Sequence, residues 1–440
     1  MNNDIKKLAI PIILQNLISF LSASIDTLML TQLDGLSFSA VSLAGQIFFA
    51  VTLLNGGITS SMSVLTSQYY GKKEISSMKN ILSYALWVTF LFNGSLSFFC
   101  FFFPEAVMSL LSDNIQLIEI GTSYLKIVAL SYILYGFISV LMEILRSVHD
   151  VKFCMYLSFV AMACNGILNA LMIFGIGPFP ALGVRGCAYA TSISRILQFV
   201  ILTLYFVKKE TILHLHMKEI LLPDLSLSRL YASAAVPVVA NEFFWALGDS
   251  ILVSFIGRSD AQTIEVYGIM NLLSQFSAIT NNGLISAICI RIGNTIGEGE
   301  DVKKEIEKVR TVAVKAAFLS SVIILSYIPL LQPFNHLSGN TLSLAKFILC
   351  EGAFIQIFSC LQCMNVVGIL RGCGDFRFGI WNDMIFLWAY TIPLAYVLFN
   401  ICDLSFLIIY PLIKSDQIIK YFTSQIRISC KMKSDIKGIV

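Results

Sequence analysis

The stretch ILRSVHDVKF, residues 144–153, returns as ILRGCGDFRF at residues 369–378, 225 positions further along the chain. Other matches recur at an offset of 226: NGGITSSM (55–62) with NNGLISAI (281–288), Pro11 with Pro237, Asp34 with Asp260, and Gly71 with Gly297. A nearly constant offset over most of the chain indicates an internal duplication. The fold should therefore consist of two similar halves.

The composition is typical of a membrane protein. Of 440 residues, 57% are hydrophobic and only 13% are charged, and the mean hydropathy is +0.79. A soluble surface needs much more charge than this. The net charge of +3 is too small and too dispersed for a nucleic-acid-binding protein. The composition therefore predicts a polytopic, all-α integral membrane protein, with the lipid bilayer as its partner and no nucleic acid.

Twelve apolar runs approach the length of about 20 residues that a membrane-spanning helix needs. They lie near residues 8–33, 38–66, 81–103, 121–145, 153–175, 186–207, 230–257, 263–290, 311–331, 345–370, 379–400 and 403–425. Lys6 and Lys7 precede the first run and no small-residue cleavage site follows it, which indicates an uncleaved helix. The last run is the weakest, because its apolar core is short. Eleven spans followed by an amphipathic tail is the alternative.

The positions of the 30 Lys and Arg residues predict the orientation of the spans, because cytoplasmic loops hold most basic residues. With both termini in the cytoplasm, most of them lie in cytoplasmic segments. The exceptions include Arg185, Arg258 and Lys346 outside the membrane, and Lys126, Arg195 and Lys315 within spans. This distribution predicts a multi-pass protein of the plasma membrane, the inner membrane of the cell, with an even number of spans.

The predicted domains are an N-terminal six-helix bundle (1–207), a cytoplasmic linker (208–229), a C-terminal six-helix bundle (230–425) and a basic cytoplasmic tail (426–440). Both halves begin in the cytoplasm and contain an even number of spans, so they point the same way. Parallel repeats of this kind build transporters, whose central cavity between the bundles opens alternately to either side. Such a chain is expected to act as a monomer, whereas a channel is more often built from several chains.

Four motifs carry a resemblance to a known family. They are IDTLML (25–30), GKK (71–73), LNALMIFGIGPFPALGVRGCAYATSIS (168–194) and LRGCGDF (370–376). The chain resembles the multidrug and toxic compound extrusion (MATE) family over residues 8 to about 430. The resemblance implies a secondary active multidrug efflux antiporter. In such an antiporter H⁺ or Na⁺ enters while an organic, often cationic or amphipathic, compound leaves by alternating access.

Polar side chains within the first, fifth and sixth spans predict an ion-coupling site. A carboxylate inside a span is costly and usually marks an ion or proton path. Asp26 lies about 28 Å above Lys7 at 1.5 Å per residue, in the outer part of the membrane. Asn165, Asn169 and Thr191 reach a similar depth and supply oxygen atoms, which suit a proton network or a small cation such as Na⁺. Solvation of Asp26 at the interface and helix packing by the two Asn residues are the alternatives.

The resemblance implies the same role for Asp26, Asn165 and Asn169. Some archaeal members of the family carry a second carboxylate at the position of Asn169. A relay of two carboxylates is therefore not expected in this chain, and one acid with neutral ligands fits Na⁺ or a single proton.

The C-terminal half does not copy the acids of the N-terminal half. At the offset of 226, Asp26 falls on Leu252 and Asn16 falls on Glu242. An acid beside aromatic rings can hold a lipophilic cation by charge pairing and by cation–π attraction. We therefore expect substrate binding at Glu242, Phe243, Trp245 and Asp249. Lipid-facing aromatic residues beside a packed Glu are the alternative.

No combination of residues indicates an enzyme. The histidines are scattered, at positions 149, 214, 216 and 336, and the CLQC segment (360–363) has no second Cys pair, which favours packing over metal binding. We expect no enzymatic activity, no cofactor and no metal other than a coupling H⁺ or Na⁺. Small organic compounds are the expected partners. The alternative function is a flippase for lipid-linked oligosaccharides or peptidoglycan precursors, which should line its cavity with several Arg and Lys to hold a pyrophosphate.

Overall fold

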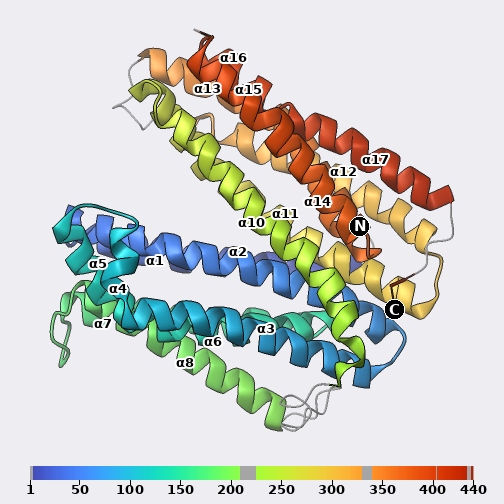
Figure 1. The fold of residues 1–440 in the computed structure, drawn as a ribbon, viewed down its shortest axis with the longest axis horizontal. Coiled ribbons are helices and arrows are strands. Elements are labelled where there is room, and N and C mark those ends of the chain that lie inside the picture. The colour runs from blue at the N-terminus through green and yellow to red at the C-terminus, as the bar shows by residue number, and fades with distance from the viewer. Residues whose placement is uncertain (1–2, 209–223, 330–338, 403, 434–437, 440) are drawn as a thin grey trace. The chain divides into compact units, whose positions relative to one another are not determined.

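The computed structural model describes residues 3–208, 224–329, 339–402, 404–433 and 438–439 (Figure 1). All regular secondary structure in these ranges is helical. Most of the predicted linker lies outside the described residues, as do His214, His216 and His336. The all-helical architecture agrees with the predicted fold class.

The chain divides into two compact units. The N-terminal unit is Leu14–Ala235, and the C-terminal unit is Val236–Val440 together with Met1–Ile13. The two boundaries fall inside helices α1 (Asn3–Leu30) and α10 (Ser228–Ile256). Each unit is described separately below.

The N-terminal unit is a helical bundle. After α1 it contains α2 (Gly35–Gly71), α3 (Ile75–Phe102), α4 (Pro104–Ser109), α5 (Ile115–Val128), α6 (Leu130–Ser147), α7 (Val151–Phe174) and α8 (Val184–Lys208). Helices α5 and α6 meet at Ala129 and together cover the predicted fourth span. Tyr132 and Leu125 are almost fully buried in a core shared by these helices.

The C-terminal unit is also all-helical. After α10 it contains α11 (Ala261–Glu298), α12 (Val302–Ser326), α13 (Gly339–Cys363), η3 (Met364–Leu370), α14 (Phe376–Met384), η4 (Ile385–Thr391), α15 (Ile392–Asn400), α16 (Phe406–Lys414) and α17 (Asp416–Lys433). The segments η3 and η4 are π-helical and continue their neighbouring α-helices without a break. π-Helical turns are rare and occur frequently at functional sites.

Ten described helices are long and apolar enough to cross a membrane. The predicted spans 263–290 and 403–425 are not among them. Helix α11 carries several polar residues, including Ser277, Asn281 and Asn282, and these lower its hydropathy. Helices α16 and α17 meet at Ser415, and α17 buries a polar stripe: Asp416, Lys420 and Ser424, followed by Ile428. The twelfth run is therefore helical, with one face turned into the C-terminal unit.

Residues related by the internal duplication have the same local role in both units. Asp34 caps α2 by accepting a hydrogen bond from the Ser37 N–H at 2.7 Å, and Asp260 caps α11 by accepting one from the Thr263 N–H at 3.1 Å. Side-chain acceptors at this position satisfy the free N–H groups of a helix start. The shared caps explain why the sequence offset marks helix boundaries so clearly.

Candidate functional site

The structure brings together three of the four predicted ion-coupling residues. Asp26 lies on α1, and Asn165 and Asn169 lie one turn apart on α7. The Asn169 Nδ2 atom donates to Asp26 Oδ1 at 2.5 Å and to Asn165 Oδ1 at 3.2 Å. Both asparagines are buried. One amide therefore connects the carboxylate to a second amide across two helices.

The hydrogen bonds of this cluster leave one acceptor unused. The Oδ1 atom of Asn169 is buried and has no hydrogen-bond partner among the described residues. A buried carbonyl oxygen without a donor is unfavourable, by about 1–3 kcal/mol. Such an oxygen beside a carboxylate is suited to a cation or a proton-bearing ligand. The oxygens of Asp26, Asn165 and Asn169 lie together and are of the type that could hold Na⁺.

Thr191, the fourth predicted residue, shares a cavity wall with Asp26. The cavity has a volume of about 240 Å³ and is otherwise lined mainly by apolar and aromatic side chains of α1, α2, α5, α6 and α8. Thr191 lies on α8, while Asn165 and Asn169 are not among the lining residues. Asp26 is therefore the residue that joins the amide cluster to the cavity.

Arg195 belongs to the same cavity and was not among the predicted site residues. It lies one turn beyond Thr191 on α8, donates to the Ser131 hydroxyl at 2.6 Å, and places its guanidinium 4.3 Å from the centre of the Phe48 ring. Its spacing of four residues from Thr191 could have predicted that the two side chains lie together, because residues i and i+4 share one face of a helix. This cavity contains both a carboxylate and a guanidinium.

The hairpin between α7 and α8 holds Asn169 and Thr191 in place. Leu182 donates its N–H to the Met172 carbonyl at 2.9 Å, and Gly183 donates to the Ile173 carbonyl at 3.3 Å. A Cβ atom on Gly186 would lie 2.4 Å from the Met172 carbonyl oxygen, so only glycine allows this approach. These contacts fall within residues 168–194, the longest of the four motifs quoted above.

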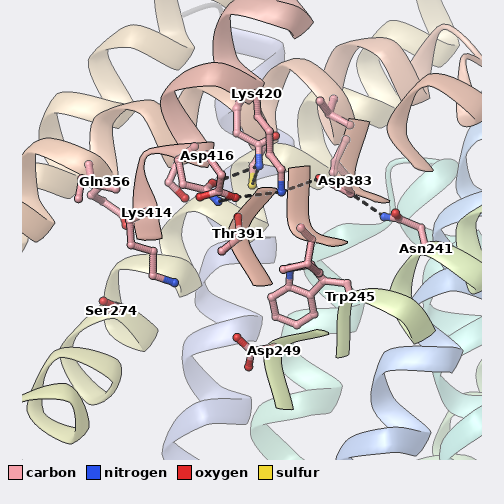
Figure 2. A pocket seen from close by; sticks show the side chains of 18 of the residues that line it. Asn241, Trp245, Asp249, Ser274, Gln356, Asp383, Thr391, Lys414, Asp416 and Lys420 are labelled. Carbon is pink, nitrogen blue, oxygen red and sulfur yellow. Dashed lines mark hydrogen bonds and ion pairs between the residues drawn. The ribbon is translucent and has the colours of Figure 1, made fainter. Parts of the chain in front are cut away.

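The C-terminal unit contains a larger cavity of about 590 Å³, within the range of small-molecule sites (Figure 2). Three of the predicted substrate-binding residues, Glu242, Trp245 and Asp249, line it. Phe243 does not line it, and its side chain is 52% exposed. Figure 2 shows Asp249 and Trp245 on the same side of the cavity, both contributed by α10.

Two groups of ion pairs surround this cavity. Glu242 lies 3.7 Å from Arg371, at the end of η3. The ammonium of Lys420 lies 3.3 Å from Asp383 Oδ1 and 3.2 Å from Asp416 Oδ2. None of Arg371, Asp383, Asp416 and Lys420 was among the predicted site residues. Asp383 had the same signal as Asp26, a carboxylate inside an apolar run, and Asp416 with Lys420 had the i, i+4 spacing of a helical ion pair.

The ten long apolar helices among the described residues, with buried charges within them, indicate a multi-pass membrane protein. Comparisons with known proteins show what the chain is similar to. The family model MatE matches residues 11–171. The probable multidrug resistance protein YoeA of Bacillus subtilis is 24% identical, covering 90% of this chain and 87% of the relative. The probable multidrug resistance protein NorM of Agrobacterium fabrum is 23% identical, covering 89% and 85%.

Solved structures agree on the fold. A structure described as the outward-facing conformation of a multidrug resistance MATE family transporter of the MOP superfamily matches with a TM-score of 0.86 at 17% identity, covering 98% of this chain and 96% of that chain. A MOP superfamily transporter from Pyrococcus furiosus, described as having a binding pocket of reverse polarity, matches with a TM-score of 0.85 at 17% identity, covering 98% and 96%. By sequence the chain is similar to MATE-family proteins, and it shares the fold of solved MATE-family transporters.

Proposed function

We propose that this chain is a secondary active antiporter that exports organic, cationic or amphipathic compounds in exchange for H⁺ or Na⁺. One observation carries the proposal: Asp26, inside a membrane helix, joins a buried amide cluster with an unused oxygen to a cavity. A carboxylate in this setting can bind a proton or a monovalent cation from a water-filled path. The names of the relatives YoeA and NorM support a multidrug cargo.

The coupling would act through α1. Ion binding at Asp26 changes its bond to Asn169 and therefore the position of α1 relative to α7. An ion drives transport only if it binds the outward-open and inward-open states with different affinities. A bond between two different helices meets this requirement if its length differs between the two states.

The C-terminal cavity supplies features that suit the cargo. Glu242, Asp249 and the ring of Trp245 line one wall, and carboxylates beside an indole ring attract a lipophilic cation. A volume of about 590 Å³ is sufficient for a drug-sized compound. We propose the plasma membrane as the location, cytoplasmic termini and a monomeric state, since the basic residues follow that orientation and one chain holds both units.

The alternative of a flippase for lipid-linked precursors is not favoured. Such a carrier needs unpaired Arg and Lys to hold a pyrophosphate. Of the three cations that line the larger cavity, Arg371 and Lys420 are already engaged by carboxylates, which leaves Lys414 alone.

Efflux from proteoliposomes tests the proposal. The natural chain should expel a fluorescent lipophilic cation when an inward proton or Na⁺ gradient is imposed, and the ion that works identifies the coupling ion. Asp26→Asn should reduce the gradient-driven rate to that of empty liposomes. The matched control is Asp34→Asn, which changes an Asp to an Asn at a helix cap where Asn serves equally well. Failure of the natural chain under both gradients would contradict antiport, and persistence of transport in Asp26→Asn would contradict the coupling site.

A further inference from the structure

Lys420 is a buried lysine whose ammonium contacts two carboxylates. The Lys420 side chain is 3% exposed and bridges two carboxylates, one from α14 and one from the start of α17 (Figure 2). Two ionised carboxylates that share a buried site repel each other, and they stay charged together only if a cation lies between them. The ammonium of Lys420 is that cation in this structure.

The polar groups around the bridge resemble an oxygen-lined cation site. The second oxygen of Asp383 accepts a hydrogen bond from Asn241 Nδ2 at 3.1 Å, and Asp416 Oδ2 accepts one from Gln417 Nε2 at 2.9 Å. Asn241 is only 7% exposed and lines the same cavity, and its Oδ1 atom has no hydrogen-bond partner among the described residues. The cluster therefore offers one more buried oxygen than its present contacts use. Hard monovalent cations prefer such carboxylate and amide oxygens.

The neighbouring charges do not replace Lys420. Arg371 lies against Glu242 at 3.7 Å. Lys414 lines the cavity, but among the described residues it forms no ion pair with Asp383 or Asp416. Of the described cavity residues, Lys420 is the one that contacts both Asp383 and Asp416.

We propose that Lys420 is a tethered counter-cation: its ammonium occupies the place of a dissociable monovalent cation between Asp383 and Asp416, so that truncating Lys420 creates a Na⁺ site there. A cation bound covalently to α17 cannot be released into either compartment. The place between Asp383 and Asp416 is then closed to a coupling ion while Lys420 occupies it. The inference concerns binding to the purified protein and holds whether or not the proposed antiport is correct.

Thermal melting of the purified full-length protein in detergent tests this inference, with NaCl titrated against choline chloride at constant ionic strength. All proteins carry Asp26→Asn, so that Na⁺ binding in the N-terminal unit does not contribute. Lys420→Met should acquire a Na⁺-dependent rise of about 2 °C or more in the melting midpoint, as expected for a ligand that binds only the folded state. Lys420→Arg, which keeps a cation in place, should not acquire it. Adding Asp383→Asn to Lys420→Met should abolish it.

Two results would overturn the inference. One is a Lys420→Met protein whose melting midpoint responds to Na⁺ no more than that of its parent. The other needs no change at Lys420: if the parent responds to Na⁺ and Asp383→Asn removes that response, Na⁺ already binds while Lys420 is present. The parent is the Asp26→Asn protein, which keeps Lys420. If its melting midpoint does not respond to Na⁺, with or without Asp383→Asn, the inference is supported even where Lys420→Met fails to fold.

Discussion

The polar sites of the two units show two solutions to the same problem, a carboxylate inside a membrane helix. In the N-terminal unit, Asp26 is held by the neutral amide of Asn169. In the C-terminal unit, Asp383 and Asp416 are held by the ammonium of Lys420. A neutral amide leaves the negative charge of Asp26 available for a proton or an ion from solution, whereas the ammonium of Lys420 offsets one of the two carboxylate charges beside it. Duplicated scaffolds can therefore keep equal helix boundaries while their charges take different roles.

The largest expected effect tests whether the C-terminal charges depend on one another. Lys420→Met leaves two buried carboxylates without their cation, and removing one partner of a buried ion pair typically costs about 3–5 kcal/mol. We expect a large fall in the melting midpoint measured in Na⁺-free buffer. Lys414→Met is the matched control, because Lys414 lines the same cavity and forms no ion pair with a described residue. Equal destabilisation by Lys420→Met and Lys414→Met would show that the ion pairs of Lys420 are unimportant. An equally large effect of Asp26→Asn would remove the distinction between the N-terminal and C-terminal sites.

The next effect concerns the support of the N-terminal site. Gly186→Ala would place a methyl group 2.4 Å from the Met172 carbonyl oxygen, which forces α7 and α8 apart. Overpacking of this kind costs about 1–3 kcal/mol. We expect a lower melting midpoint and weaker ion coupling. Gly166→Ala, on the same helix pair, is the control, since its new methyl group would approach nothing closer than 3.9 Å. Similar results for both glycines would show that the close approach is unimportant.

An effect of similar size is expected from the amide beside Asp26. Asn169→Ala removes the hydrogen bond to Asp26 and one to Asn165. Hydrogen bonds to charged groups contribute about 1.5–3 kcal/mol, so the ion concentration for half-maximal transport should change about tenfold or more. Asn93→Ala is the control, because Asn93 is an equally buried amide of the same unit that pairs with Asn55 instead. An unchanged ion dependence in Asn169→Ala would separate Asn169 from coupling.

The smallest effect comes from a helix cap. Hydrogen bonds from the Thr263 hydroxyl and N–H lower the pKa of Asp260 below its ordinary value. The stabilisation is therefore present above the pKa of the unfolded chain, about 4, and is lost as the pH falls through the lower pKa of the folded state. Asp260→Ala should cost about 0.5–1 kcal/mol at neutral pH. Asp260→Asn should keep the cap and remove its pH dependence, measured as melting midpoint against pH; an unchanged pH profile would contradict the assigned cause.

Much of the fold could be predicted from the sequence. Apolar runs of about 20 residues have few alternatives to a helix in a membrane, because every backbone N–H and C=O must be satisfied internally. Asp34 and Asp260 could be matched by offset alone and cap equivalent helices. The break at Ala129 and the π-helical segments could not be predicted, since they depend on how neighbouring helices pack.

The candidate sites were predictable only in part. Asn165 and Asn169 were matched to Asp26 by their depth in the membrane, and depth follows directly from residue number. Arg195 and Lys420 could not be placed in the same way, because a long side chain reaches several ångströms from its backbone. Phe243 and Trp245 are two residues apart on α10 and therefore point in different directions, and only Trp245 reaches the cavity.

The hairpin between α7 and α8 also has a mechanical consequence. Its backbone hydrogen bonds and the close approach at Gly186 join the end of α7 to the start of α8, so we expect Asn169 and Thr191 to move together. Asp26 belongs to α1 and is free of that constraint. The distance between Asp26 and Asn169 therefore reports movement of α1 relative to α7. The distance between Asn165 and Asn169, which both lie on α7, is a fixed reference. A pair of spectroscopic labels on α1 and α7 would test whether α1 moves in this way.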